Sequence, residues 1–489
     1  MEREATRKNT RLLMVTPGNI RNNHLYTRGL DDFFPSDCVG PSRKRLKTSE
    51  NGHEIELVLD GMDEVITTDF GANAKTGKPR GFFRGRTWVR QFFEHHKVKA
   101  GAELALERLG ARRYRLSVAA KPNGGGPFKA AEFFAGIGLV RLALENEGWN
   151  VVFANDIDPD KAEMYRRKWP QDDHLVVGDI HKLDADELPT CDLFTASFPC
   201  NDLSIAGKWE GLNGKESSAF WGFMRIIRDL GSRRPRLVLL ENVVGFLMSH
   251  GGADFEQALL ALNELGYTVD AFILNAVHWT PQSRARLFVV AKLDEGVERT
   301  SIANVSDVRP ELLQKFIFTH PEILWDIQKL PVLPKHSVRL EGIIDRSAKA
   351  EESWWDGERT EYFMAQLSER HRADADRMIE GRSYSYATAF RRVRNGKSMA
   401  ELRTDGIAGC LRTPRGGSGR QILFKAGRGK YQVRLLTARE CARLQGVPED
   451  YPIDVPLNQA LFGFGDAVCV PAVQWIAANY LSNFVEQPT

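Results

Sequence analysis

Cysteine is scarce in this sequence, with 6 residues in 489, and no two of them form a CxxC pair. Small disulfide-stabilised domains and the common zinc modules need closely spaced cysteines or a higher cysteine content, so both classes are excluded. We therefore expect a reducing, cytoplasmic setting and no bound metal.

Long hydrophobic runs are also missing. No apolar stretch reaches about 18 residues and the first residues are polar, so the sequence predicts neither a membrane span nor a secretory signal. The net charge is only +3, which by itself is too small to establish nucleic-acid binding. With 42% hydrophobic and 27% charged residues, the composition is that of a soluble globular protein long enough for about three domains.

Residues 1–120 combine strand-like stretches with basic residues. Runs 41–47 and 80–93 are basic, and the second interleaves arginines with aromatic residues. Such a segment can contact phosphates above an aromatic core, although the first run is equally well a solvated loop. In general pattern the region resembles B3-like pseudobarrel DNA-binding domains. A glycine-rich linker at 121–127 predicts a domain boundary.

Three strand ends after the linker carry residues suited to an adenosine-bearing ligand. A strand over 128–134 leads to Gly136 and Gly138, where a ligand can approach the backbone. Arg141 occupies the place of a third glycine, which counts against NAD. Asp156 follows Gly136 by 20 residues, the spacing for binding ribose hydroxyls, and Asp179 ends a third strand near the adenine amino group. Each aspartate is separately explained as a helix cap.

Cys200 lies just beyond a short apolar strand over 191–197. An open α/β sheet places its chemistry at such a strand end, and Pro199 shapes the loop. The thiol is therefore a candidate nucleophile, although a cytosolic cysteine is more often a small buried hydrophobe. Few apolar residues lie between 201 and 220, which predicts a loop that closes over the site.

Eight short motifs occur in the order typical of one family. They start at Phe134, Asp156, Gly178, Phe198, Glu241, Gln282, Arg439 and Gly465. With these motifs the chain resembles the DNA (cytosine-5)-methyltransferases, bacterial modification enzymes in particular, over about 128–293 and 434–484. The resemblance implies an α/β, Rossmann-like domain at 128–294 completed by 434–489 and a target-recognition region at 295–433. It also implies S-adenosylmethionine as methyl donor and a base rotated out of the duplex. The pattern of residues 1–120 separately predicts a mainly-β DNA-binding domain there.

The resemblance gives catalytic roles to Cys200, Glu241, Arg284 and Arg286. The cysteine adds to C6 of cytosine, and Glu241 acts as an acid near N3. Arg284 and Arg286 alternate along a strand, so both are expected to converge on one anionic site. The alternatives are a helix cap for Glu241 and a surface ion pair for each arginine.

The remaining implied contacts are to the cofactor and to DNA. The cofactor set is Phe134, Ala135, Gly136, Ile137, Gly138, Leu139, Asp156, Ile157, Asp179, Ile180, Pro199, Asp466 and Ala467. The DNA set is Ser204, Gln282, Arg412, Thr413 and Arg415, the last three from a basic, glycine-rich stretch that suits the major groove. Two stretches of the insert, 322–328 and 361–369, read as helical, and a terminal helix carrying Val470 and Tyr480 should pack on the sheet.

Several residues depart from the family pattern. Asp466 stands where an asparagine normally meets the cofactor, and Asp156 replaces a common glutamate. The other departures are Leu139, Asn201, Leu203 and Glu216. They weaken the expectations for the loop and for the methionine end of the cofactor, while the nucleophile and the acid remain.

The sequence thus predicts a site-specific, monomeric DNA (cytosine-5)-methyltransferase without membrane contact, the modification half of a restriction or phage-defence system with a cognate endonuclease encoded nearby. Methylation of tRNA and a catalytically silent DNA-binding protein are the alternatives. The large insert and the basic amino-terminal region favour duplex DNA. The presence of Cys200 and Glu241 argues against the silent protein.

Overall fold

A computed structural model describes most of the chain. The described residues are 10–15, 19–20, 23–25, 27, 33–40, 53–60, 62, 64–72, 79–84, 87–96, 98, 103–118, 128–199, 218–293, 304–335, 339–394, 396–413 and 419–485. Cys200, Ser204, Arg415, the run 41–47 and the linker 121–127 lie outside them. Two compact units are present, a smaller one over Met1–Lys121 and a larger one over Pro122–Thr489.

The smaller unit is mainly β structure. Its five-stranded sheet has the order β1-β7-β8-β3-β4, and a second sheet has the order β2-β5-β6. The bounds are β1 Thr10–Met14, β2 Val39–Gly40, β3 Ile55–Leu59, β4 Glu64–Thr68, β5 Phe70–Ala72, β6 Pro79–Phe83, β7 Glu103–Arg108 and β8 Arg113–Val118, with η1 Ser36–Cys38 and α3 Thr87–His95. Strand β8 alternates buried Tyr114 and Leu116 with exposed Arg113 and Arg115, as one covered face requires.

The segment 80–93 contributes its aromatic residues to this core. Phe83, Trp88, Phe92 and Phe93 are all buried, as predicted. Arg84 pairs with Asp69 at 2.6 Å instead of pointing away from the protein. The B3-like resemblance of this unit stays a prediction.

The larger unit is built on a seven-stranded sheet with the order β11-β10-β9-β12-β13-β15-β14. All neighbours are parallel except at β15, which is antiparallel to both β13 and β14. The bounds are β9 Lys129–Phe133, β10 Asn150–Asp156, β11 Leu175–Val177, β12 Leu193–Ala196, β13 Leu237–Val243, β14 Tyr267–Asn275 and β15 Ala285–Leu293. The predicted strands are thus confirmed, and the order reverses between β9 and β12, where such sheets bind ligands.

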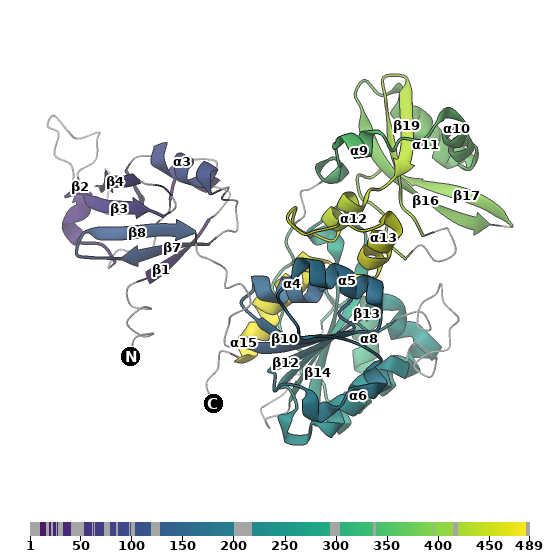
Figure 1. Cartoon of the computed structure of the whole chain (residues 1–489), viewed down its shortest axis with the longest axis horizontal. Coiled ribbons are helices and arrows are strands. Elements are labelled where there is room, and N and C mark those ends of the chain that lie inside the picture. Colours follow the sequence, from purple (N-terminus) through teal and green to yellow (C-terminus); the bar gives the residue numbers. More distant parts are fainter. Residues whose placement is uncertain are drawn as a thin grey trace. The chain divides into compact units, whose positions relative to one another are not determined.

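Helices cover both faces of this sheet, with α4 and α5 on one side and α6 on the other in Figure 1. Successive strand residues alternate between two cores: Leu237 and Leu239 face α4, whereas Val238 and Leu240 face α6 and α7. The bounds are α4 Leu139–Asn146, α5 Pro159–Lys168, α6 Ser218–Asp229 and α7 Ala253–Glu264, with short η3 Ile180–Lys182, η4 Ala185–Glu187, η6 Gly231–Arg233, η7 Val244–Gly252 and η8 Ala276–His278.

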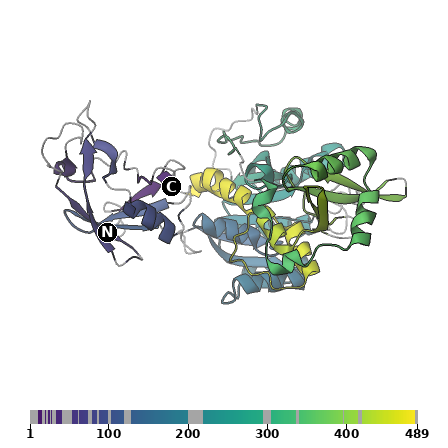
Figure 2. The same cartoon turned by 90° about the horizontal axis from the view of Figure 1, so that it is seen from above.

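The end of the chain returns to the first strands. Figure 2 shows the C-terminal helices, in yellow, beside the early part of this unit, in blue. Their bounds are α12 Ala438–Leu444, α13 Leu457–Asp466, α14 Val470–Ile476, η10 Ala477–Leu481 and α15 Ser482–Val485. Val470, Val473, Ala477 and Tyr480 are buried in the core that contains α4, which confirms the predicted terminal helix.

The insert divides between two places. Its four-stranded antiparallel sheet has the order β17-β16-β18-β19 and packs on α10 and α11. The bounds are β16 Ser385–Arg394, β17 Lys397–Arg403, β18 Ile422–Gly427, β19 Lys430–Leu435, α9 Ala348–Glu351, α10 Gly357–Ala365 and α11 Glu369–Glu380, with η9 Leu340–Ile343. In contrast, α8, Glu311–Thr319, packs on the face of the seven-stranded sheet that α6 and α7 cover.

The helix expected over 322–328 is wrong. Ile323, Trp325 and Ile327 are buried in alternation and Trp325 bridges Val269 of β14, so the segment is extended along the sheet edge. The helix expected over 361–369 holds only in part, since α10 ends at Ala365 and α11 begins at Glu369, capped by Ser368.

One helical stretch among the described residues, Leu457–Leu481, is long and apolar enough to span a membrane by those two criteria. It consists of α13, followed after a break at 467–469 by α14, which continues directly into η10. Because most of this stretch is buried against α4 and the sheet, we assign it to the core.

A buried acid in β9 makes stability depend on pH. Burial raises the pKa of Glu132 from 4.5 to about 8. Between these values the folded protein keeps a proton that the unfolded chain loses, so stability falls as pH rises, by at most about 1.4 kcal/mol per pH unit. Glu132→Gln should therefore stabilise the larger unit more at pH 8 than at pH 5, measured as urea midpoints. An equal effect at both pH values would contradict this assignment.

Candidate active site

The carboxyl ends of four parallel strands bring the predicted site residues to one edge of the sheet. Strand β9 leads to the loop 134–138, β10 to Asp156, β11 to Asp179, and β12 to the segment 197–199. Strand β13, which is parallel to β12, ends with Glu241 in the same region. The residues therefore converge although they span more than 100 positions of sequence.

The loop 134–138 needs its glycines. Phe134, Gly136 and Gly138 all have positive φ, at 56°, 56° and 78°. A Cβ on Gly138 would lie 2.4 Å from the ring of Trp169, so no side chain fits there. Gly136 is different, because its open side meets only Lys161 Cδ, at 4.0 Å. The backbone is thus accessible to a ligand at Gly136.

Asp156 fixes this loop. Its Oδ2 accepts from the Gly136 backbone N–H at 2.6 Å and its Oδ1 from that of Asp158 at 2.8 Å. Burial raises the pKa of Asp156, and the two backbone donors oppose that rise. On the opposite side of the loop, the Tyr451 hydroxyl donates to the Ile137 carbonyl at 2.6 Å. The side chains of Ala135, Ile137 and Leu139 are buried.

The ends of β10 and β11 form an open, partly apolar surface. Ile157 is 67% exposed and Val177 is 38% exposed. A Cβ on Gly178 would meet nothing within 4 Å. Asp179 caps η3 through the His181 N–H at 3.0 Å, and Ile180 is buried. Apolar side chains, an open glycine and carboxylates suit a flat nucleobase with its ribose, so these residues fit an adenosine group.

Glu241 lies at the end of β13 with its side chain 11% exposed. Arg286 holds it, with Nε 3.1 Å from Glu241 Oε1. The next residue, buried Asn242, donates from Nδ2 to the carbonyl of Phe198 at 3.3 Å. This bond joins the strand that carries the carboxyl to the segment that leads through half-buried Pro199 into Cys200.

Arg284 and Arg286 both lie near Cys410, whose Sγ is 3.3 Å from Arg284 Nη1 and 3.9 Å from Arg286 Nη2. The side chain of Arg284 is buried and also donates to the carbonyls of Leu411 at 2.7 Å, Gly465 at 3.2 Å and Ala467 at 2.6 Å. Arg284 directly precedes β15 and is thus enclosed by backbone of the insert and of the chain end, whereas Arg286, in β15, pairs with Glu241.

Gln282 is also not available to DNA in this structure. Its side chain is fully buried, accepts from the Leu411 N–H at 3.0 Å and donates to the Leu444 carbonyl at 2.8 Å. The predicted DNA contact is therefore replaced by a link between the loop before β15 and two distant segments.

Arg412 and Thr413 lie beside the chain end. A Cβ on Gly465 would lie 2.7 Å from the carbonyl carbon of Arg412, so only glycine allows these backbones to approach. The Arg412 side chain is exposed. Asp466 pairs with Lys161, Nζ to Oδ2 2.6 Å, and Ala467 is half-buried.

Two residues at this edge have no sequence signal. Lys161 belongs to none of the motifs, and neither does Cys410, whose Sγ lies 3.3 Å from Arg284 Nη1 and 3.9 Å from Arg286 Nη2. Burial alone would raise the pKa of Cys410, but these guanidinium groups lower it below its ordinary value. Lys161 reaches the site from α5 and Cys410 from the insert. The spacing of motifs along the sequence does not reveal these tertiary contacts.

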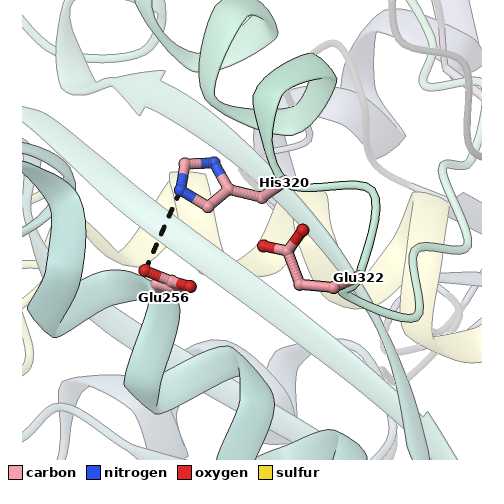
Figure 3. Close-up of side chains that lie close together, drawn as sticks. All are labelled: Glu256, His320 and Glu322. Atoms are coloured by element: carbon pink, nitrogen blue, oxygen red, sulfur yellow. Dashed lines mark ion pairs between the residues drawn. The ribbon is translucent and has the colours of Figure 1, made fainter.

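One group among the described residues has the geometry to hold a metal ion. Glu256, His320 and Glu322 place ligating atoms within 4.8 Å of one another (Figure 3). His320 Nε2 lies 4.0 Å from Glu256 Oε2, and the ring stacks on Phe316. These residues come from α7 and from the segment after α8, which carry none of the predicted site residues, and we assign them to surface pairing.

Comparisons with known proteins identify the family of this chain. The profile of the family described as C-5 cytosine-specific DNA methylase matches residues 128–482. Type II methyltransferase M1.ScrFI of Lactococcus lactis subsp. cremoris is 29% identical over 72% of this chain and 78% of its own. Type II methyltransferase M.HhaI of Haemophilus parahaemolyticus is 29% identical over 73% of this chain and 95% of its own.

Two solved structures share the fold. The Entamoeba histolytica methyltransferase EhMeth matches with a TM-score of 0.51 at 14% identity, covering 74% of this chain and 99% of that one. The S. pombe Dnmt2 methyltransferase matches with a TM-score of 0.50 at 18% identity, covering 74% and 99%. The order and direction of strands, the glycine loop, the carboxylates at successive strand ends and the family match together show that this chain belongs to the C-5 cytosine-specific DNA methylases, which use S-adenosylmethionine.

Proposed function

We propose that this protein is a site-specific methyltransferase that modifies C5 of a cytosine rotated out of duplex DNA. The observation that carries the proposal is the junction of Asn242 with the Phe198 carbonyl, since it sets the Glu241 carboxyl beside the segment leading to Cys200. A thiol and an acid at one strand edge are what addition to a cytosine ring requires.

Cys200 acts as the nucleophile. Its sulfur forms a bond to C6 of the cytosine, and the displaced electron pair moves to C5 and N3, where Glu241 donates a hydrogen bond or proton. Arg286 orients Glu241 through the 3.1 Å contact. S-adenosylmethionine, when bound, supplies an electrophilic methyl group. After C5 has been methylated, loss of the C5 proton returns an electron pair to the ring and expels the thiolate of Cys200.

The strand edge supplies the cofactor contacts. Asp156 and Asp179 are assigned to ribose and adenine, with the exposed Ile157 against the base plane. The loop 134–138, together with Pro199, Ile180 and the segment 466–467, surrounds the remaining part of the cofactor. Support comes from Gly178, where a Cβ would meet nothing within 4 Å among the described residues, and from Gly136, where it would meet only Lys161 Cδ at 4.0 Å.

DNA recognition is assigned to the insert and to the smaller unit. Residues 295–433 are assigned to the target-recognition region, with Arg412, Thr413 and Arg415 as contacts to the duplex, and Ser204 is assigned to a further DNA contact. Residues 1–120 add affinity for the backbone. Residues 128–294 and 434–489 together form the catalytic domain.

The biological setting follows from the relatives. The two relatives above are named type II methyltransferases. We therefore infer that this protein is a cytoplasmic monomer and that it is the modification enzyme of a restriction-modification or related defence system with a cognate endonuclease. The alternative of tRNA methylation is less well supported, because the insert and the basic smaller unit suit duplex DNA.

Cys200→Ser should abolish methyl transfer and leave binding of S-adenosylhomocysteine unchanged, because only the attack on C6 is lost. Tritium transfer to duplex DNA and calorimetry measure the two properties. Duplex DNA containing 5-fluorocytosine should trap a covalent adduct with the wild type and none with the variant. Cys191→Ala, at a buried cysteine before β12, is the control that should keep activity. A Cys200→Ser protein with full activity would refute the mechanism.

Replacing Arg284, directly before β15, and Arg286, within β15, should have different effects on stability and activity. Arg284→Met removes a donor from three carbonyls, of which that of Ala467 keeps Gln445, and a buried carbonyl left unsatisfied costs about 1 to 3 kcal/mol, so the change should lower the denaturation midpoint. Arg286→Met should keep most of the stability and lower kcat, because Glu241 loses its orienting partner. Urea denaturation and single-turnover rates decide this, and equal destabilisation by both changes would argue against the distinction.

Deletion of residues 1–120 should weaken DNA binding while methyl transfer remains detectable. Fewer phosphate contacts release fewer counterions, so the slope of log affinity against log salt should become shallower. Fluorescence anisotropy with labelled duplex at several salt concentrations measures the slope. The DNA role of the smaller unit would be rejected by an affinity that does not change at any salt concentration.

A further inference from the structure

Lys161 extends from the first part of α5 to the edge that carries the glycine loop. Its Nζ lies 2.6 Å from Asp466 Oδ2, and its side chain is only 18% exposed, compared with 44% for Asp466. Its Cδ is also the group nearest to the open side of Gly136. A lysine side chain from outside every motif therefore lies beside the backbone of the glycine loop.

The charge of this lysine is fixed by its neighbours. Burial alone would lower the pKa of Lys161, but Asp466 raises it and Asp156 and Asp158 add to that, so the net pKa is above the ordinary value. Asp466 accepts hydrogen bonds and has none to donate when ionised. Lys161 is thus the side chain of this pair that can donate to an anionic group of a ligand.

The order of the strands places the two ends of the cofactor. Asp179 and Asp156, at the ends of β11 and β10, are assigned to the adenosine part, and the base that accepts the methyl group is attacked by the residue that follows β12. Strand β9 lies between β10 and β12. The amino-acid part of the cofactor, which carries one carboxylate and one ammonium group, therefore lies over the loop after β9 and beside Lys161 and Asp466.

We propose that the Lys161–Asp466 pair recognises the zwitterionic amino-acid end of the methyl donor, Lys161 binding its carboxylate and Asp466 its ammonium group. This inference rests on the proposed function for the cofactor contacts. The pair presents one charge of each sign, and together they match the two charges of the ligand. Lys161 and Asp466 are binding residues for the cofactor and take no part in the attack on cytosine.

The experiment compares two nucleosides by calorimetry on the full chain. S-adenosylhomocysteine carries the amino-acid end, whereas 5′-methylthioadenosine lacks both of its charges. Lys161→Met should weaken binding of S-adenosylhomocysteine by about 10-fold or more, the loss expected for a charge-assisted hydrogen bond, and leave 5′-methylthioadenosine unchanged. Lys161→Arg, which keeps the charge, should retain most of the affinity.

Lys168→Met is the matched control. Lys168 lies on the same helix, is equally exposed at 18%, and pairs with Asp450 at 3.1 Å, so its loss should change neither affinity. Equal weakening of both nucleosides by Lys161→Met, or no weakening of either, would overturn the proposal. Failure of the wild type to bind either nucleoside would overturn the cofactor assignments on which it rests.

Discussion

The buried guanidinium of Arg284 connects three parts of the larger unit that are distant in sequence. From the position directly before β15 it reaches the Leu411 carbonyl 127 residues later and the Gly465 and Ala467 carbonyls more than 180 residues later. Loss of a donor to a buried carbonyl is costly, so these bonds hold the three segments together. The insert can therefore lie between the last strand of the sheet and the C-terminal helices without separating those helices from the first strands.

A second set of buried polar groups supports the same closure. Gln282 joins Leu411 to Leu444, and Gln445 donates to the carbonyls of Phe464 and Ala467 at 2.7 and 3.1 Å. These contacts place Asp466 opposite α5, while Tyr451 holds the glycine loop. This edge of the sheet is thus assembled from both ends of the larger unit: Asp156 holds the glycine loop from 20 positions away and Tyr451 from more than 300.

The electrostatics of the edge follow from this assembly. Asp156 is partly satisfied by backbone N–H groups, and Asp466 by Lys161, so two carboxylates are tolerated beside one loop. Glu241 is held by Arg286 in a largely buried position next to the segment that leads to Cys200. Asp156 and Glu241 therefore lie at the ends of two strands of one sheet, each held by different hydrogen-bond or ion-pair partners.

The sequence alone determined the local features. Apolar runs predicted strands β9 to β13 and β15, because a strand buried on both faces is a continuous apolar stretch, and helical spacing of apolar residues predicted the terminal helix. The glycines and aspartates at the strand ends predicted a ligand site at that edge of the sheet. Tertiary structure decided the rest. Ile323, Trp325 and Ile327 are extended because the edge of β14 accepts them, and Gln282 and Arg284 are internal because distant segments cover them. Lys161 pairs with Asp466, 305 positions later in the chain. This contact could not be predicted from the sequence, because long-range packing leaves no periodic pattern of residues.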